Sequence, residues 1–253
     1  MKTTGNTILI TGGGSGIGRG LAEAFHALGN QVIVAGRRQQ VLDETTKANS
    51  GMRSIALDIE SAAQIGAFAG QVEQEFPALN VVIHNAGIMR PENLHAQQDD
   101  LADAEATITT NLLGPIRLTA ALLPLLKRQR TAAIMTVSSG LAFVPMAATP
   151  TYCATKAAIH SYSQSLRYQL RETNVQVLEL IPPYVQTELM GERQAKDPRA
   201  MPLDSFIAEA MEILKLQPGA TEICVKRVED LRYAAASGKY DDFFKAFNDA
   251  VAA

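Results

Sequence analysis

The stretch TILITGGGSGIG, from Thr7 to Gly18, indicates how this chain folds. Its first residues, Thr7–Ile10, form an apolar run typical of a short buried strand. The glycines after this run allow a tight turn in which backbone N–H groups approach a phosphate. A helix beginning there adds the favourable dipole of its N-terminus. The spacing is Thr-Gly-x-x-x-Gly-x-Gly and not Gly-x-Gly-x-x-Gly, so a plain tight turn stays the alternative. The position between a strand and a helix favours a nucleotide-binding turn, formed by Gly12, Gly14, Ser15, Gly16, Ile17 and Gly18.

The same alternation of apolar runs and helical patterns continues along most of the chain. The runs are Thr7–Ile10, Gln31–Ala35, Arg53–Leu57, Asn80–Ile83, Ala132–Val137 and Val175–Leu180. The helical stretches are about 17–28, 38–48, 61–75, 99–128 and 152–171. Near-continuous apolar strands between helices predict an α/β fold, a doubly wound parallel sheet covered on both faces. The later segments are a mobile loop over 186–204, a helix over 204–217, a last strand over Thr221–Lys226 and a helix over 228–252.

Length and composition predict one soluble, cytoplasmic domain over residues 1–253. The cofactor-binding half is expected at about 5–130 and the catalytic and substrate-binding half at about 131–253. Hydrophobic residues make up 47% of the chain, enough for a sizeable core, and the net charge is −3. Basic residues are scattered, which excludes a nucleic-acid partner. No signal peptide is visible and the apolar runs are too short and interrupted to span a bilayer, so no membrane is expected. The two cysteines, Cys153 and Cys224, have no metal-binding spacing, and no metal is expected.

The end of the second strand favours NADP over NAD. A carboxylate there would bind the adenosine ribose hydroxyls, but this strand is followed by Arg37 and Arg38. A guanidinium pairs with phosphate, which fits the 2′-phosphate of NADP. An ordinary solvated arginine pair is the alternative. Asp58, after the third strand, is a candidate partner for the adenine amino group or, equally, a residue of a helix N-cap region.

Small residues follow the fourth strand at Asn85, Ala86 and Gly87. They allow the cofactor to approach closely, and the asparagine amide can brace neighbouring strands. A simple turn is the competing interpretation.

Ser139, Tyr152 and Lys156 form the candidate catalytic set. Tyr152 and Lys156 lie four residues apart, on one face of a helix. An ammonium near a phenol favours the phenolate, so we expect Lys156 to lower the pKa of Tyr152 and allow proton transfer near neutral pH. Ser139 follows a buried strand, at the mouth of the sheet. A tyrosine and a lysine at this spacing also occur by chance as structural residues.

In this order, the motifs resemble those of the short-chain dehydrogenase/reductase superfamily. The matching residues are Thr11-Gly12-x-x-x-Gly16-x-Gly18, Asn85-Ala86-Gly87, Asn111, Ser139, Tyr152-x-x-x-Lys156 and Pro182…Thr187. They cover roughly residues 5–190. The resemblance implies one Rossmann-type domain with about seven strands, assembled as a homodimer or homotetramer. A closer resemblance, to oxidoreductases encoded in D-alanyl-lipoteichoic acid operons, is carried by segments 139–143, 152–160 and 166–171.

The resemblance also implies a role for each matching residue. Tyr152 is the general acid in carbonyl reduction and the base in alcohol oxidation, while Ser139 binds the reacting oxygen. Lys156 binds the nicotinamide ribose, and Asn111 kinks its helix and holds a water in the proton relay. Thr187 binds the nicotinamide carboxamide. Ser138 is the neighbouring alternative to Ser139, but the family spacing selects Ser139. The implied cofactor site also includes Ile59, Pro182 and Val185.

Three positions or segments depart from the family pattern. His84 stands where an asparagine is usual, and Pro183 replaces a glycine and stiffens the nicotinamide-side loop. The tail lacks the usual glycine-rich ending, so a dimer through the helices near 100–128 and 152–171 is expected.

The function expected from the sequence is hydride transfer between NADP(H) and a carbonyl compound or secondary alcohol, with a catalytically silent nucleotide-binding sensor or scaffold as the alternative. The substrate wall is expected to be mostly apolar, and its candidates are Leu141, Phe143, Pro145, Met146 and Tyr184. His95 and His160 are interpreted as surface or core-edge histidines, and Cys153 as a small packing residue beside the site.

Overall fold

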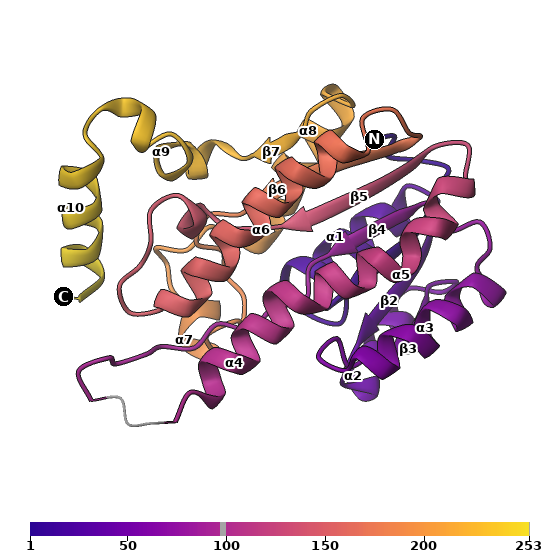
Figure 1. Cartoon of the computed structure of the whole chain (residues 1–253), viewed down its shortest axis with the longest axis horizontal. Helices are drawn as coiled ribbons and strands as arrows, with labels where there is room; N and C mark the ends of the chain where they lie inside the picture. Colours follow the sequence, from indigo (N-terminus) through magenta and orange to yellow (C-terminus); the bar gives the residue numbers. More distant parts are fainter. Residues whose placement is uncertain (97–99, 253) are drawn as a thin grey trace.

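The computed structural model describes residues 1–96 and 100–252 and contains a doubly wound parallel sheet (Figure 1). Within these residues seven strands pair in the order β3-β2-β1-β4-β5-β6-β7. Their bounds are β1 Thr7–Thr11, β2 Gln31–Gly36, β3 Arg53–Ala56, β4 Val81–His84, β5 Ala132–Val137, β6 Val175–Ile181 and β7 Glu222–Cys224. From β1 the chain adds β2 and β3 on one side and then β4 to β7 on the other, so the order of the strands reverses between β1 and β4. Open α/β sheets bind ligands at this point, beyond the carboxyl ends of their strands. The predicted fold class is confirmed.

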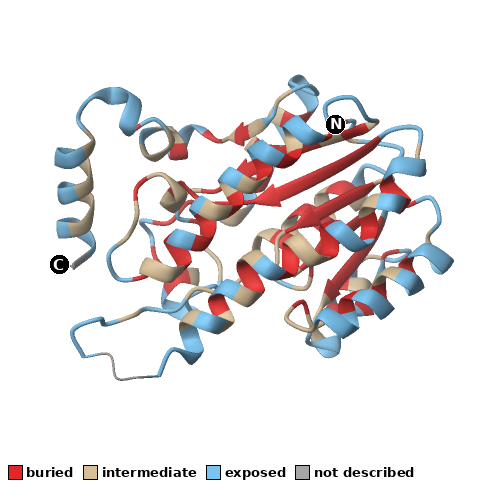
Figure 2. Ribbon diagram, in the orientation of Figure 1, coloured by how far each residue is buried: buried red, intermediate tan, exposed pale blue. Residues whose placement is uncertain are grey.

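Two layers of helices enclose the sheet. Helices α1 (Gly16–Ala27), α2 (Gln39–Ala48) and α8 (Leu203–Leu216) contribute to one apolar cluster. Helices α3 (Ala62–Glu75), α5 (Gly114–Arg128) and α6 (Pro150–Gln169) contribute to a second one. Figure 2 shows the strands buried and the helices exposed on their outer faces. Because strands buried on both faces must be apolar throughout, the sequence runs predicted their positions to within a residue or two.

The helix expected over 99–128 is interrupted by a π-helical turn; residue 99 lies outside the described residues. Helix α4 spans Ala102–Ile108, the π turn spans Thr109–Leu113, and α5 follows. A π turn inserts one residue into the helical ladder and turns a side chain out of its regular position. The run Ala102–Arg128 is long and apolar enough to cross a membrane by length and composition, a test that buried core helices also pass. The leucines of α5 pack in the apolar core beside the sheet.

The C-terminal region is less regular than the sequence indicated. The expected loop over 186–204 contains a short helix, α7 (Glu192–Ala195), and Val185 forms a parallel bridge with Met201. The helix expected over 228–252 is divided into α9 (Glu229–Arg232), a 3₁₀ turn and α10 (Tyr240–Ala252). Gly238, at φ 72°, ends the 3₁₀ turn before α10 in a conformation that L side chains rarely adopt. Figure 1 shows α10 beside the body of the fold.

Candidate active site

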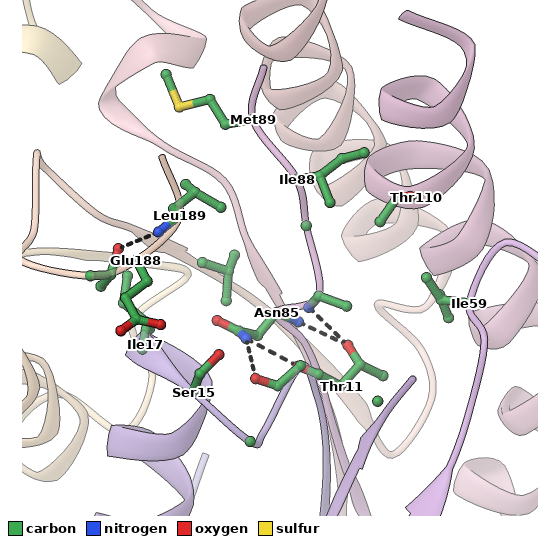
Figure 3. Close-up of a pocket in the computed structure, with 18 of the residues that line it drawn as sticks. Thr11, Ser15, Ile17, Ile59, Asn85, Ile88, Met89, Thr110, Glu188 and Leu189 are labelled. Atoms are coloured by element: carbon green, nitrogen blue, oxygen red, sulfur yellow. Dashed lines mark hydrogen bonds between the residues drawn. The ribbon is translucent and has the colours of Figure 1, made fainter. Parts of the chain in front are cut away.

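A cavity of about 740 Å³ opens at the carboxyl ends of the central strands. Its wall is formed by the turn after β1, the end of β2, the segments after β3, β4, β5 and β6, and side chains of α2, the π turn and α6. Figure 3 shows residues of the turn after β1 and of the segments after β4 and β6 around a common space. The sheet topology therefore brings the candidate nucleotide-binding turn and the candidate catalytic residues to one cavity.

At the turn after β1, glycines occupy positions where a side chain would strain the backbone or collide with neighbouring atoms. Gly12 and Gly16 have φ values of +67° and +52°. A Cβ atom at Gly12 would lie 2.9 Å from the Cα atom of Ala86, and one at Gly18 would lie under 3.0 Å from the Gly12 oxygen. Gly18 does not line the cavity; its role is to let α1 pack closely beneath the turn.

Thr11 and Asn85 join β1 and β4 at the point where the strand order reverses (Figure 3). The Asn85 amide donates to the carbonyl oxygens of Thr11 at 3.0 Å and Gly12 at 3.3 Å. The Thr11 hydroxyl accepts the backbone N–H groups of Asn85 and Ala86, each at 3.1 Å. The bracing expected of Asn85 is thus present, and these bonds fix the floor of the cavity.

Arg37 and Arg38 line the opposite end of the cavity. Arg37 is half exposed, and its Nη1 atom lies 3.0 Å from Glu60 Oε1. Thr110 donates its hydroxyl to the same oxygen at 2.7 Å. Ile59 lines the wall, but Asp58 does not: its carboxylate accepts the Glu60 N–H at 3.1 Å, as a turn residue before α3.

The three candidate catalytic residues line the cavity at its other end. Ser139 lies two residues after the end of β5 and accepts the backbone N–H of Leu141 at 3.1 Å. Tyr152 and Lys156 lie on α6, and both are buried. The Lys156 ammonium donates to the carbonyl oxygen of Val137 at 2.8 Å, and it lies 5.5 Å from the centre of the Tyr152 ring.

Burial dominates the protonation of this site. Burial raises the pKa of Tyr152, and a hydrogen bond involving Ser139 opposes this increase only in part. Burial lowers the pKa of Lys156 to about 8, against the opposing charge of Glu179. The pKa of Tyr152 is therefore raised and not lowered as expected, because loss of water around the phenolate is the largest effect on it. Tyr152 is a neutral phenol at pH 7.

Asn111 lies in the π turn, outside the cavity wall. Its amide oxygen accepts the N–H of Ile88 at 2.9 Å, and its amide nitrogen donates to the Ile88 carbonyl at 2.9 Å. It also donates to the Thr155 hydroxyl at 3.2 Å. Asn111 thus connects the segment after β4 to α6 between Tyr152 and Lys156.

Pro182, Val185 and Thr187 line the cavity beyond β6. The Thr187 hydroxyl accepts a hydrogen bond from the Gln194 amide at 3.1 Å, which fixes it beside α7. Pro183 lines the same wall.

His84 is buried at the end of β4. Its Nε2 atom lies 2.8 Å from the Thr119 hydroxyl, and burial lowers the pKa of His84 to about 4. This departure from the family pattern therefore places a neutral imidazole between the sheet and α5.

The predicted substrate residues Leu141, Phe143 and Tyr184 do not line the cavity. The Phe143 ring packs edge-on against His160, with centroids 4.7 Å apart. The Tyr184 hydroxyl donates to Asp197 Oδ2 at 3.2 Å.

Further residues that sequence reasoning missed line the cavity, among them Met89, Arg90, Glu188, Leu189 and Gln194. Met89 and Arg90 come within three residues of Gly87, and Glu188 and Leu189 directly follow Thr187, which is their signal in the sequence. Figure 3 shows Met89 and Leu189 at the side of the cavity away from Thr11. Arg90, Glu188 and Gln194 make this part of the wall polar.

Two histidines and a cysteine singled out in the sequence lie where expected. His95 is exposed and His160 is partly buried at the edge of α6. Cys153 is buried, its sulfur lies 3.3 Å from the Met146 N–H group, and burial raises the pKa of its thiol. Cys153 is a packing residue beside Tyr152.

The chain belongs to the short-chain dehydrogenase family, whose pattern matches residues 6–198. A similar relative is the protein described as uncharacterized oxidoreductase DltE of Bacillus subtilis, which is 39% identical over 98% of both chains. A short-chain dehydrogenase of Burkholderia cenocepacia, solved with NADP, has a TM-score of 0.80 and 24% identity, covering 94% of this chain and 96% of its own. A short-chain dehydrogenase/reductase of Burkholderia phymatum, solved with NAD, has a TM-score of 0.79 and 19% identity, covering 96% and 95%. The resemblance seen in the sequence is confirmed.

Proposed function

We propose that this protein is an NADP(H)-dependent oxidoreductase that interconverts a carbonyl compound and a secondary alcohol. The observation that carries the proposal is the arrangement of Ser139, Tyr152 and Lys156 at one end of a cavity whose other end is bordered by the glycine turn and Arg37. Membership of the short-chain dehydrogenase family supports an oxidoreductase activity.

The cavity fits a nicotinamide dinucleotide. The glycine turn before α1 leaves backbone N–H groups and the helix N-terminus free of side-chain bulk, as a pyrophosphate requires. Thr187 and Val185 border the same cavity as Tyr152, which supports a role for both in holding the nicotinamide. When bound, the nicotinamide supplies or accepts the hydride, and the protein supplies orientation and proton transfer.

Each catalytic side chain has a role that follows from its surroundings. The neutral Tyr152 phenol donates its proton to the substrate oxygen as the carbonyl is reduced. The Ser139 hydroxyl donates a hydrogen bond to the same oxygen and stabilises its developing charge. The Lys156 ammonium stabilises the phenolate that the transfer leaves behind, and burial strengthens this attraction.

Arg37 and Arg38 support a preference for NADP, because a guanidinium pairs with the 2′-phosphate. The contact of Arg37 with Glu60 occupies one edge of its guanidinium and leaves its other N–H groups for a phosphate. Glu60 also favours the alternative, NAD, because a carboxylate near the adenosine end repels a 2′-phosphate.

The direct test measures nicotinamide oxidation by the purified protein with a panel of carbonyl compounds, offering NADPH and NADH in parallel. We expect turnover with NADPH and its loss in Tyr152→Phe, which keeps the ring but removes the proton donor. Binding of NADPH that is equal in both proteins, with no turnover in either, would favour the nucleotide-binding sensor and contradict the proposal.

A further inference from the structure

Strand β6 carries a carboxylate in an otherwise apolar run. Glu179 is fully buried, with 0% of its surface exposed. Its Oε2 atom accepts a hydrogen bond from His160 Nδ1 at 2.8 Å. Its Oε1 atom has no hydrogen-bond partner among the described residues. Burying a carboxylate with one oxygen unsatisfied is destabilising unless a nearby positive charge compensates it.

The nearest catalytic charge is the Lys156 ammonium, on the helix that covers Glu179. In the sheet, Glu179 pairs in register with Thr136 on β5, and Lys156 donates to Val137, the next residue along β5. The Thr136 hydroxyl contacts Ser163 at 2.7 Å. Residues 156, 160 and 163 follow the i, i+4, i+7 spacing of one helix face. The carboxylate and the ammonium thus face the same part of the sheet beneath α6.

His160 orients the Glu179 carboxyl group through a hydrogen bond. A carboxylate only accepts hydrogen bonds, so the hydrogen of this pair belongs to His160 Nδ1. The Gln164 amide nitrogen lies 3.1 Å from the other ring nitrogen, Nε2, and donates to it. His160 is thus held at both ring nitrogens, and this fixes the orientation of the Glu179 carboxyl group against α6.

The other charged groups around Glu179 are already matched. Glu222, its register neighbour on β7, binds the Arg232 guanidinium through both oxygens, at 2.7 and 2.9 Å. Arg167 is held by the backbone carbonyls of Val177 and Thr221. The Cys224 thiol stays protonated, because burial raises its pKa to about 12. Lys156 is therefore the remaining cation whose positive charge Glu179 compensates.

A bound metal ion explains this cluster less well. Ligand atoms of His160, Glu179 and Glu222 lie within 4.8 Å of one another. A divalent cation there would have to displace Arg232 from Glu222 or share the carboxylate with a guanidinium. Since both Glu222 oxygens are already bonded, the geometry favours internal charge compensation.

We propose that Glu179 is a positioning residue for catalysis: its buried charge, oriented by His160, keeps the Lys156 ammonium protonated inside the active site. This rests on the oxidoreductase function proposed above. In support, burial lowers the pKa of Lys156, and Glu179 is the group that opposes this effect. Without Glu179, Lys156 would lose its proton closer to neutral pH and could no longer stabilise the Tyr152 phenolate.

The test is the pH profile of kcat/KM for carbonyl reduction in wild type and Glu179→Gln, a change that keeps the shape and a hydrogen-bond acceptor for His160. We expect the alkaline limb to move to lower pH by about one unit, with little change in rate at pH 6. Glu222→Gln is the matched control, because it removes the same charge from the paired position on β7, where Arg232 compensates it. Its alkaline limb is expected to stay at the wild-type pH.

Glu179→Asp keeps the charge and is expected to restore the wild-type limb. Urea unfolding of each variant shows whether it folds, and Glu179→Asp replaces Glu179→Gln in the test if the latter does not fold. An alkaline limb that shifts in Glu179→Asp as far as expected for loss of the charge would contradict the proposal. So would coincident limbs in wild type and Glu179→Gln, or equal shifts in Glu179→Gln and Glu222→Gln.

A second readout separates this inference from the proposed function. The Lys156 ¹⁵Nζ signal, assigned with Lys156→Met, reports the titration of the ammonium by NMR without any turnover. A lower titration midpoint in Glu179→Gln supports the inference even if no carbonyl compound is reduced. An unchanged midpoint overturns it even if the protein is an active reductase.

Discussion

Replacing Gly18 by alanine tests how closely α1 must approach the turn that borders the cavity. The added Cβ atom would lie under 3.0 Å from the Gly12 oxygen and from the Asn85 amide nitrogen. Neither atom belongs to a flexible side-chain end that can swing away. The Gly12 oxygen is backbone, and the Asn85 amide is held by its bonds to Thr11 and Gly12.

The cost follows from these contacts. Forcing an extra methyl group into a packed site costs about 1–3 kcal/mol. Moving the Asn85 amide weakens two hydrogen bonds, each worth about 1 kcal/mol. Alanine regains about 1 kcal/mol over glycine inside a helix. We therefore expect Gly18→Ala to lower the free energy of unfolding by about 2–3 kcal/mol and the Tm by about 5–10 °C.

Urea unfolding followed by circular dichroism measures this change, and Gly70→Ala is its control. Gly70 lies in α3, is exposed, and has nothing within 4 Å of an added Cβ atom. The control should be more stable than wild type by about 0.5–1 kcal/mol, because only helix propensity changes. If Gly18→Ala is as stable as Gly70→Ala, the close packing between α1 and the turn does not constrain this position, and the reasoning fails.

Two further predictions concern the cofactor and pH. Arg37→Ala should raise the KM for NADPH by about 10–100-fold, since hydrogen bonds to charged groups contribute about 1.5–3 kcal/mol. The KM for NADH should stay within about twofold, and equal changes for both cofactors would refute a contact with the 2′-phosphate. Acidification should destabilise the fold through His84, whose pKa of about 4 lies below its ordinary 6.5. The unfolded chain then binds the proton first, so stability is complete above about pH 6.5 and falls by about 3 kcal/mol towards pH 4. Urea midpoints across this range, with His84→Asn as the variant that should flatten the dependence, measure it.

The sequence predicted the sheet well because its strands are buried on both faces. Runs such as Ala132–Val137 contain no regular polar alternation, and the structure has a strand with the same bounds. The residues of the candidate site were also predictable where their position after a strand is enough to bring them to the cavity. Ser139 and Thr187 follow strand ends, so their arrival at the cavity follows from the topology.

Features that depend on long-range side-chain contacts were not predictable. The π turn over Thr109–Leu113 has an ordinary helical sequence, and the bonds of Asn111 to Ile88 are visible only in the folded chain. Phe143 was expected in the substrate wall because it is apolar and near Ser139. It packs instead against His160 and the Arg232 guanidinium, which comes from a distant part of the chain.

Glu179 is an instance in which the sequence carried a signal that was missed. A single acidic residue within the run from Val175 to Ile181 breaks the pattern of a buried strand. An acidic residue in such a run indicates either an exposed strand at the edge of the sheet or a functional buried carboxyl group, and the structure shows that Glu179 is buried.

The strand order has a consequence for how the chain folds during synthesis. Strand β1 lies inside the sheet, with β2 on one side and β4 on the other. Its partner β4 begins at Val81, far later in the chain than β2. Until about 80 residues have left the ribosome, the nascent chain exposes one apolar edge of β1 with unpaired N–H and C=O groups. Early folding is therefore a stage at which this protein is open to aggregation and to chaperone binding.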